Sequence, residues 1–152
     1  MPAADFRPTV RDIGARLGGR TLTEQGDRIG EFNAETFPTA QSVDSIIGDA
    51  LNIVASAIGE ELEEKFWDMA KAAVISYACM EIEAGYYPET TSQADSSYAS
   101  FRTRFQDQIT YIEKALDERR PDENRIVSVR QYSRVHGGVG GRLDPWANEM
   151  LP

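Results

Sequence analysis

The sequence has few of the residues that disulfide frameworks, zinc sites and imidazole catalysis require. It contains one cysteine, Cys79, and one histidine, His136, among 152 residues. A single cysteine excludes an intramolecular disulfide, and a single histidine excludes a His-rich metal site. Small disulfide-stabilised domains and zinc fingers are therefore excluded as classes.

Long apolar runs are also missing. No stretch approaches the ~18 consecutive apolar residues of a membrane span, and residues 1–9 lack the basic and apolar regions of a signal peptide. We therefore expect a protein made in a reducing cytoplasm with no membrane partner. The apolar fraction of 41% and the length of 152 residues predict one compact domain with a real core, plus a tail.

Basic residues are scarce in the middle of the chain. The formal net charge is -9, but residues 24–89 carry 14 acidic and 3 basic side chains, or -11. The segments before and after this block sum to +2 and zero. The sequence therefore predicts a strongly acidic central region rather than an evenly acidic molecule.

Apolar residues recur at three- and four-residue steps in four segments, which is the spacing of one helical face. The segments are residues 9–17, 39–58, 60–85 and 92–118. Thr9 with Asp12, and Ser92 with Asp95, have the spacing of capping boxes and predict helix starts. The sequence thus predicts an all-α fold, a small bundle of three long helices with a short N-terminal helix.

Three further patterns complete this prediction. Four glutamates between residues 60 and 64 are expected in the first turn of the third helix, where carboxylates meet the positive end of the helix dipole. Residues 21–38 mix Gly26, Gly30 and Asn33 with isolated apolar residues and are expected to form a loop, with a short strand or helical turn near 29–32. The third and fourth helices are expected to lie antiparallel.

The chain changes character after Pro121. Residues 126–135 alternate β-branched or aromatic residues with arginines, and a glycine cluster follows. One strand without a partner in the chain is unstable alone, so residues 121–152 are predicted to form an extended C-terminal arm beside a helical domain of residues 1–120. The candidate partner-binding residues are Ile126, Val127, Val129, Arg130, Tyr132, Arg134, Trp146 and Leu151.

Catalytic and metal-binding patterns are weak. Cys79 lies in an apolar helical stretch and is predicted to be a core residue, while His136 adjoins the glycine cluster and has no matched acid or base. Glu81 and Glu83 are two residues apart and fall on different faces of a helix. Residues 137–141 lack the Lys-Ser/Thr of a phosphate loop. We therefore predict no catalytic, metal or cofactor-binding residue, no cofactor and no enzymatic activity.

Three alternatives compete for the function. Residues 9–18 resemble the first helix and turn of a helix-turn-helix DNA reader, which would place a recognition helix within residues 20–30. That segment carries Glu24 and Asp27, which oppose phosphate contact. The second alternative is a small helical enzyme centred on His136 or the carboxylates, and the third is a generic helical interaction module.

Two segments carry a family resemblance. FNAETFPTAQSV at residues 32–43, with the apolar spacing that follows it, is similar to the opening of head-tail connector (adaptor) proteins of long-tailed phages. An Ala-rich helix ending in EIEAGYYPE at residues 81–89, followed by a helix with spaced aromatics, looks like the rest of that core. The likeness covers roughly residues 32–120 and leaves residues 9–17 and the arm outside it.

The resemblance implies a structural virion protein at the phage neck, made in the host bacterial cytoplasm. Such subunits form a ring, usually dodecameric, that docks on the portal protein and precedes a downstream stopper or tail-completion protein. Duplex DNA passes through the ring without specific binding, and C-terminal extensions reach the portal or a neighbouring subunit. An acidic lumen would suit this role because it repels phosphates.

Overall fold

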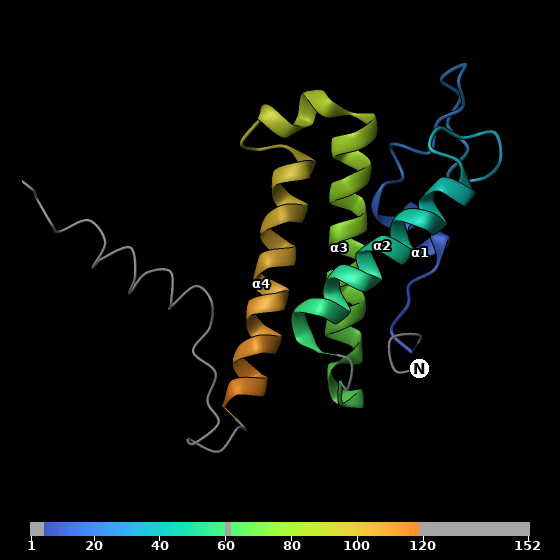
Figure 1. Cartoon of the computed structure of the whole chain (residues 1–152). Coiled ribbons are helices and arrows are strands. Elements are labelled where there is room, and N and C mark those ends of the chain that lie inside the picture. Colours follow the sequence, from blue (N-terminus) through green and yellow to red (C-terminus); the bar gives the residue numbers. More distant parts are fainter. Residues whose placement is uncertain (1–4, 60–61, 119–152) are drawn as a thin grey trace, which may run out of the picture. The chain divides into compact units, whose positions relative to one another are not determined.

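The computed structural model describes residues 5–59 and 62–118, and in these ranges the chain is all-α (Figure 1). The elements are α1 (Val10–Arg16), α2 (Ala40–Ile58), the 3-10 turn η2 (Glu64–Phe66), α3 (Trp67–Tyr86), the 3-10 turn η3 (Pro88–Ser92) and α4 (Ser97–Asp117). The predicted fold class, three long helices with a short N-terminal helix, is confirmed for this part of the chain.

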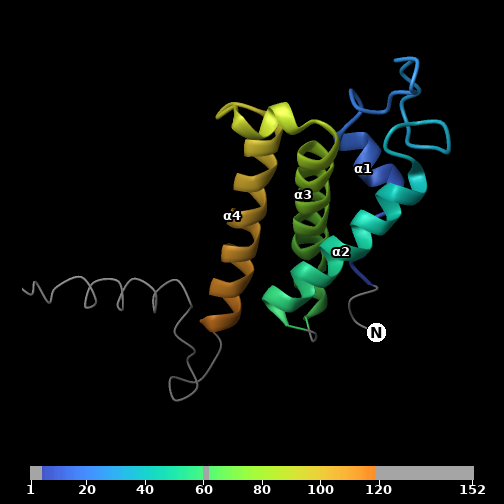
Figure 2. The ribbon, with the colours of Figure 1, turned by 45° about the horizontal axis from the view of Figure 1, so that its top comes forward.

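The helix α3 occupies the centre of the compact unit Met1–Ala115, which includes all but the last two residues of α4. The helix α2 crosses α3 obliquely, and α1 contacts both of them. The helix α4 runs antiparallel beside α3 after the turn formed by η3 (Figures 1 and 2). The antiparallel pairing predicted for the third and fourth helices is therefore present.

The starts of α1 and α2 are fixed by local hydrogen bonds. Thr9 Oγ1 accepts from the Asp12 amide at 3.2 Å, and Asp12 Oδ2 accepts from the Thr9 amide at 2.8 Å, so the predicted capping box forms. Thr39 Oγ1 accepts from the Ser42 amide at 3.2 Å and caps α2. Gly59 ends α2 with a φ of 90°, a left-handed conformation that favours glycine.

The helix α3 is buried on several faces rather than along one stripe. The helical spacing of apolar residues within 60–85 includes Ala70 and Ala73, which are buried, but also Met69, Tyr77 and Met80, which are only half-buried. Further buried positions lie on the other faces: Val74, Ala78, Cys79 and Ile82. A central helix contacts neighbours on most sides, so it buries residues on several faces and not on a single apolar face.

The third helix begins later than predicted. Residues 62 and 63 are not helical, Glu63 has an extended ψ of 143°, and a 3-10 turn precedes α3 at Trp67. The Trp67 indole Nε1 donates to the Leu62 carbonyl at 3.0 Å and holds this non-helical entry. The prediction that the glutamates of residues 60–64 form the first turn of the helix is therefore wrong for Glu63, and residues 60 and 61 lie outside the described ranges.

The fourth helix also begins later than predicted. Ser92 belongs to η3, and α4 starts at Ser97. The Ser96 hydroxyl accepts from the Ala99 amide at 3.2 Å, which is the geometry of a helix cap. The predicted Ser92–Asp95 capping box is therefore wrong, because the 3-10 turn uses Ser92 and the true cap lies four residues later.

The predicted arm, residues 121–152, lies outside the described residues together with its eight candidate partner-binding residues. No helix in the described ranges is both long and apolar enough to cross a membrane.

Candidate interaction site

The loop between α1 and α2 is held by side-chain hydrogen bonds. The buried Thr21 hydroxyl donates to the Gly18 carbonyl at 3.0 Å and accepts from the Gly30 amide at 3.1 Å. The buried Thr36 hydroxyl donates to the Pro38 carbonyl at 2.8 Å. Every polar atom named here has a partner, as burial requires, and the loop therefore has a defined conformation.

Two isolated antiparallel bridges, Leu22 with Arg28 and Thr23 with Thr36, bring the two sides of the loop together. These bridges, rather than a strand or helical turn near residues 29–32, are the regular structure in this loop. Residues 20–30 contain no helix, so the helix-turn-helix alternative lacks its recognition helix.

An ion pair joins Arg20, at the start of the loop between α1 and α2, to α3. Arg20 donates two hydrogen bonds to the Glu83 carboxylate, Nε to Oε1 at 3.1 Å and Nη2 to Oε2 at 3.0 Å. The Glu83 side chain is 1% exposed and that of Arg20 is 30% exposed. The hydrogen bond with Glu83 raises the pKa of the Arg20 guanidinium above its ordinary value. A two-point contact of this kind fixes orientation as well as distance.

Tyr87 extends this contact to the loop. The Arg20 guanidinium carbon lies 3.9 Å from the centre of the Tyr87 ring, in cation–π geometry. The Tyr87 hydroxyl lies 3.4 Å from the carbonyl oxygens of Arg20 and Phe37 and donates toward them. Burial raises the pKa of the Tyr87 hydroxyl. The phenol therefore keeps its proton near neutral pH and remains a donor.

Phe37 stands out from this framework. Its amide donates to the Leu22 carbonyl at 2.8 Å, and its ring meets Tyr86 edge-on with centroids 5.0 Å apart. The Phe37 residue is nevertheless 57% exposed. A large aromatic side chain is thus held in place by its backbone and by one neighbouring ring while much of its surface faces water.

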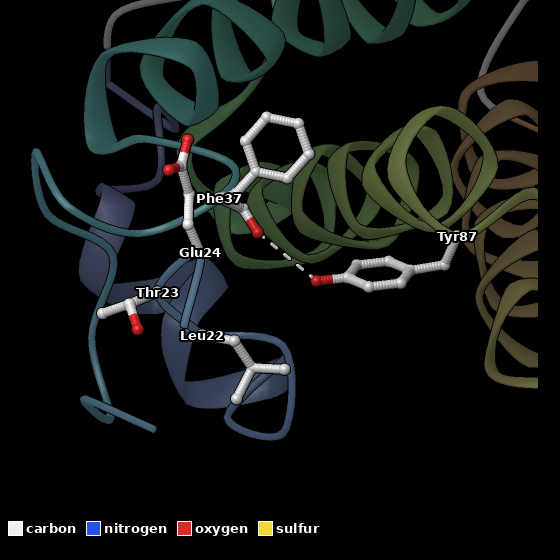
Figure 3. Close-up of a pocket in the computed structure, with 5 residues that line it drawn as sticks. All are labelled: Leu22, Thr23, Glu24, Phe37 and Tyr87. Atoms are coloured by element: carbon white, nitrogen blue, oxygen red, sulfur yellow. Dashed lines mark hydrogen bonds between the residues drawn. The ribbon is translucent and has the colours of Figure 1, made fainter. Parts of the chain in front are cut away.

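A cavity of about 350 Å³ lies beside Phe37 (Figure 3). It is lined by Leu22, Thr23, Glu24, Phe37 and Tyr87. We call these five residues, with Tyr86, the Phe37 surface. Fixed aromatic side chains beside a cavity are typical of contact surfaces for another protein, in which a few buried aromatic anchors provide most of the binding energy.

The Phe37 surface was not predicted as a site, although the sequence contains a signal for it. Phe37 and Tyr86 belong to the two segments, residues 32–43 and 81–89, that carry the resemblance to head-tail connectors. The structure brings these segments into contact through the Phe37–Tyr86 ring pair and the Tyr87 hydroxyl. The two segments are far apart along the chain, so no local sequence pattern predicts their contact.

The single-residue predictions for α3 are confirmed. Cys79 is fully buried, and burial raises the pKa of its thiol to about 12, so it is an inert core residue. Glu81 is exposed while Glu83 is buried, as their two-residue spacing predicts. Across residues 5–59 and 62–118, no group of three or more His, Cys, Asp or Glu side chains has the arrangement of a metal site. His136 lies outside these ranges.

No protein-family model, curated protein or solved structure matches this chain.

Proposed function

We propose that this protein is a structural subunit of a phage neck, which assembles as a homo-oligomeric ring between portal and tail. In this role it docks on the portal protein, extends the DNA channel toward a downstream stopper or tail-completion protein, and carries out no catalysis. It is made in the host bacterial cytoplasm and ends in the virion.

The observation that carries the proposal is the Phe37 surface. The two segments that resemble head-tail connectors form one contact, and that contact fixes an exposed aromatic ring beside a cavity. An assembly subunit needs such a surface, because a small domain must obtain its binding energy from few residues.

The charge distribution supports the same role. The helix α2 contains Asp44 and Asp49 but no basic residue, and α3 contains one lysine and three acidic residues. A channel that conducts DNA benefits from repelling phosphates, because neutralising contacts release counterions and retain the DNA. The acidic middle of the chain is therefore useful to a subunit whose ring must let DNA pass.

The test is the mass of portal rings from the same genome after mixing with the purified full-length chain, measured by light scattering. We expect the portal peak to gain many copies of the chain. Phe37→Ala should lower the affinity of the chain for the portal about 30-fold, as expected for loss of an anchor worth ~2 kcal/mol. The substitution should leave the fold intact because Phe37 is mainly exposed.

Tyr111→Ala is the matched control. Tyr111 is an aromatic residue of nearly equal exposure, 58%, on α4, and it lines neither the cavity at Phe37 nor the second one described below. The Tyr111→Ala variant should bind the portal with the same affinity as the natural chain. No mass gain with a well-folded chain would reject the connector role and leave a helical interaction module for another assembly. Equal losses for both variants would remove the Phe37 surface from the interface.

A further inference from the structure

A second cavity of about 360 Å³ lies between α2 and α3, on residues that the Phe37 surface does not use. We call it the α2–α3 groove. Its lining residues are Ile46, Asp49, Asn52 and Ile53 from α2, with Tyr77 and Glu81 from α3.

The groove combines an apolar surface with carboxylates. Ile53 is 45% exposed, and Ile46 and Tyr77 are half-buried. The ring of Phe105 on α4 packs edge-on against Tyr77 with centroids 5.0 Å apart, which fixes the Tyr77 ring. Asp49 is exposed on the same groove. An occupant would gain most if it brought apolar side chains together with positive charge.

The negative charge of the groove is not neutralised locally. Neither Asp49 nor Glu81 forms an ion pair within the described ranges. The three basic residues within the acidic range 24–89 have partners outside the groove. Arg28 donates to the Gly18 carbonyl at 2.8 Å, Lys65 pairs with Glu63 at 2.7 Å, and Lys71 pairs with Asp12 at 3.1 Å.

The chain itself contains a segment of complementary composition. Residues 125–135 carry three arginines and no acidic residue, interleaved with five β-branched or aromatic residues. From this complementarity we infer that the α2–α3 groove binds residues 125–135 of a second copy of the chain. The arginines would meet Asp49 and Glu81, and the apolar side chains would cover Ile53.

The choice of a second copy follows from the geometry of assembly. Each copy carries one groove and one such segment, which are different surfaces, so the contact is head-to-tail. Head-to-tail contacts close into rings when the rotation between subunits permits it. The inference rests on the proposed ring, and it assigns the contact between neighbouring subunits rather than the contact with the portal.

Disulfide trapping between two full-length variants tests the contact. One variant carries Asn52→Cys at the groove, where the natural side chain is exposed, and the other carries Ser128→Cys in the arm. Cys79 does not interfere, because it is fully buried and its thiol has a pKa of about 12. A disulfide between the two variants can form only between copies, and we expect it in high yield at low salt.

Gln25→Cys paired with Ser128→Cys is the matched control, since Gln25 is exposed and lies outside the groove. It should give several-fold less product. Adding Asp49→Lys and Glu81→Lys to the groove variant should lower the yield about tenfold, because like charges then face each other. Adding Arg130→Glu and Arg134→Glu to the arm variant should restore it. High salt should lower the disulfide yield of the Asn52→Cys and Ser128→Cys pair that keeps its natural charges, because salt screens their attraction.

Equal yields for the groove and control pairs would overturn the inference, as would a groove yield that the charge reversals leave unchanged. A disulfide that forms only within a chain carrying both cysteines would overturn the assignment to a second copy. Protection of the Asn52→Cys thiol by portal rings, without trapping by the arm, would assign the groove to the portal instead. Trapping without any portal mass gain would keep this contact and reject the proposed function.

Discussion

At the scale of single residues, the position of the Phe37 surface depends on a buried charge. The Glu83 carboxylate is almost fully buried and accepts both hydrogen bonds from Arg20. Removal of one partner from such a pair leaves a charge in a poorly solvated environment. The pair thus connects the loop to α3. Replacing only one of its two residues is expected to destabilise the fold, because the other charge then stays buried without a partner.

We expect Arg20→Met to lower the free energy of unfolding by about 3 kcal/mol, because it leaves Glu83 buried without its cation. The double variant Arg20→Met, Glu83→Met should be less destabilised than Arg20→Met alone. Urea denaturation followed by circular dichroism measures both. Arg7→Met is the control, because its pair with Asp44 is exposed and should be worth less than ~1 kcal/mol. A double variant that is the least stable of the three would contradict this account.

Asp12 gives the molecule a defined acid sensitivity. The hydrogen bond from the Thr9 amide lowers the pKa of the Asp12 carboxyl, with a further contribution from Lys71. A lowered folded-state pKa contributes stability above the unfolded-state value of about 3.9, and that contribution is lost as the pH falls through the folded-state value.

The natural chain should therefore exceed Asp12→Ala in stability by ~1 kcal/mol near neutral pH, as for other helix caps. The difference should shrink when the pH falls below about 4. Chemical denaturation of both proteins at neutral and acid pH measures it. A gap that widens on acidification would show that the carboxylate is not the stabilising form.

At the scale of elements, two serines distinguish the predicted start of α4 from the observed one. Ser96→Ala should cost about 1 kcal/mol of unfolding free energy because it removes the cap on the Ala99 amide. Ser92→Ala should change stability by less than ~0.5 kcal/mol, since the exposed Ser92 hydroxyl only donates to the Glu89 carbonyl. Thermal unfolding of the two variants tests this. A larger loss of stability for Ser92→Ala than for Ser96→Ala would support the capping box predicted at Ser92.

The elements that could be predicted are those whose signals are local. Thr9 and Asp12 lie within one turn, and Gly59 directly follows the stripe of α2, so both helices were located closely. The start of α3 was missed because the Trp67 indole holds a non-helical segment at Leu62, and the 3-10 turn Glu64–Phe66 follows it, whereas the nearby glutamates suit a helix start. Local propensity is a weak signal when tertiary contacts oppose it.

The candidate site could not be predicted for a related reason. Arg20 and Glu83 are 63 residues apart, and Phe37 and Tyr87 are 50 apart. Helical periodicity reports which face of a helix is buried, not which distant loop covers it. The resemblance singled out both segments of the Phe37 surface but not their contact.

At the scale of the whole molecule, the net charge of -9 makes a prediction about DNA. The full-length chain should not retain a labelled duplex even at low salt, because most of its surface charge repels phosphates. Fluorescence anisotropy of the duplex measures this, and a basic DNA-binding protein provides the positive control. Binding that weakens steeply with added salt would contradict the channel role and favour a DNA-binding function instead.

The separation of Arg20 from Glu83 also has a consequence during synthesis of the chain. A contact that closes a 63-residue segment forms only after the intervening helices reduce the entropy of closure. Phe37 therefore reaches its final position after α3 has emerged and packed. A partly synthesised chain that ends before Glu83 and Tyr87 therefore lacks the finished Phe37 surface.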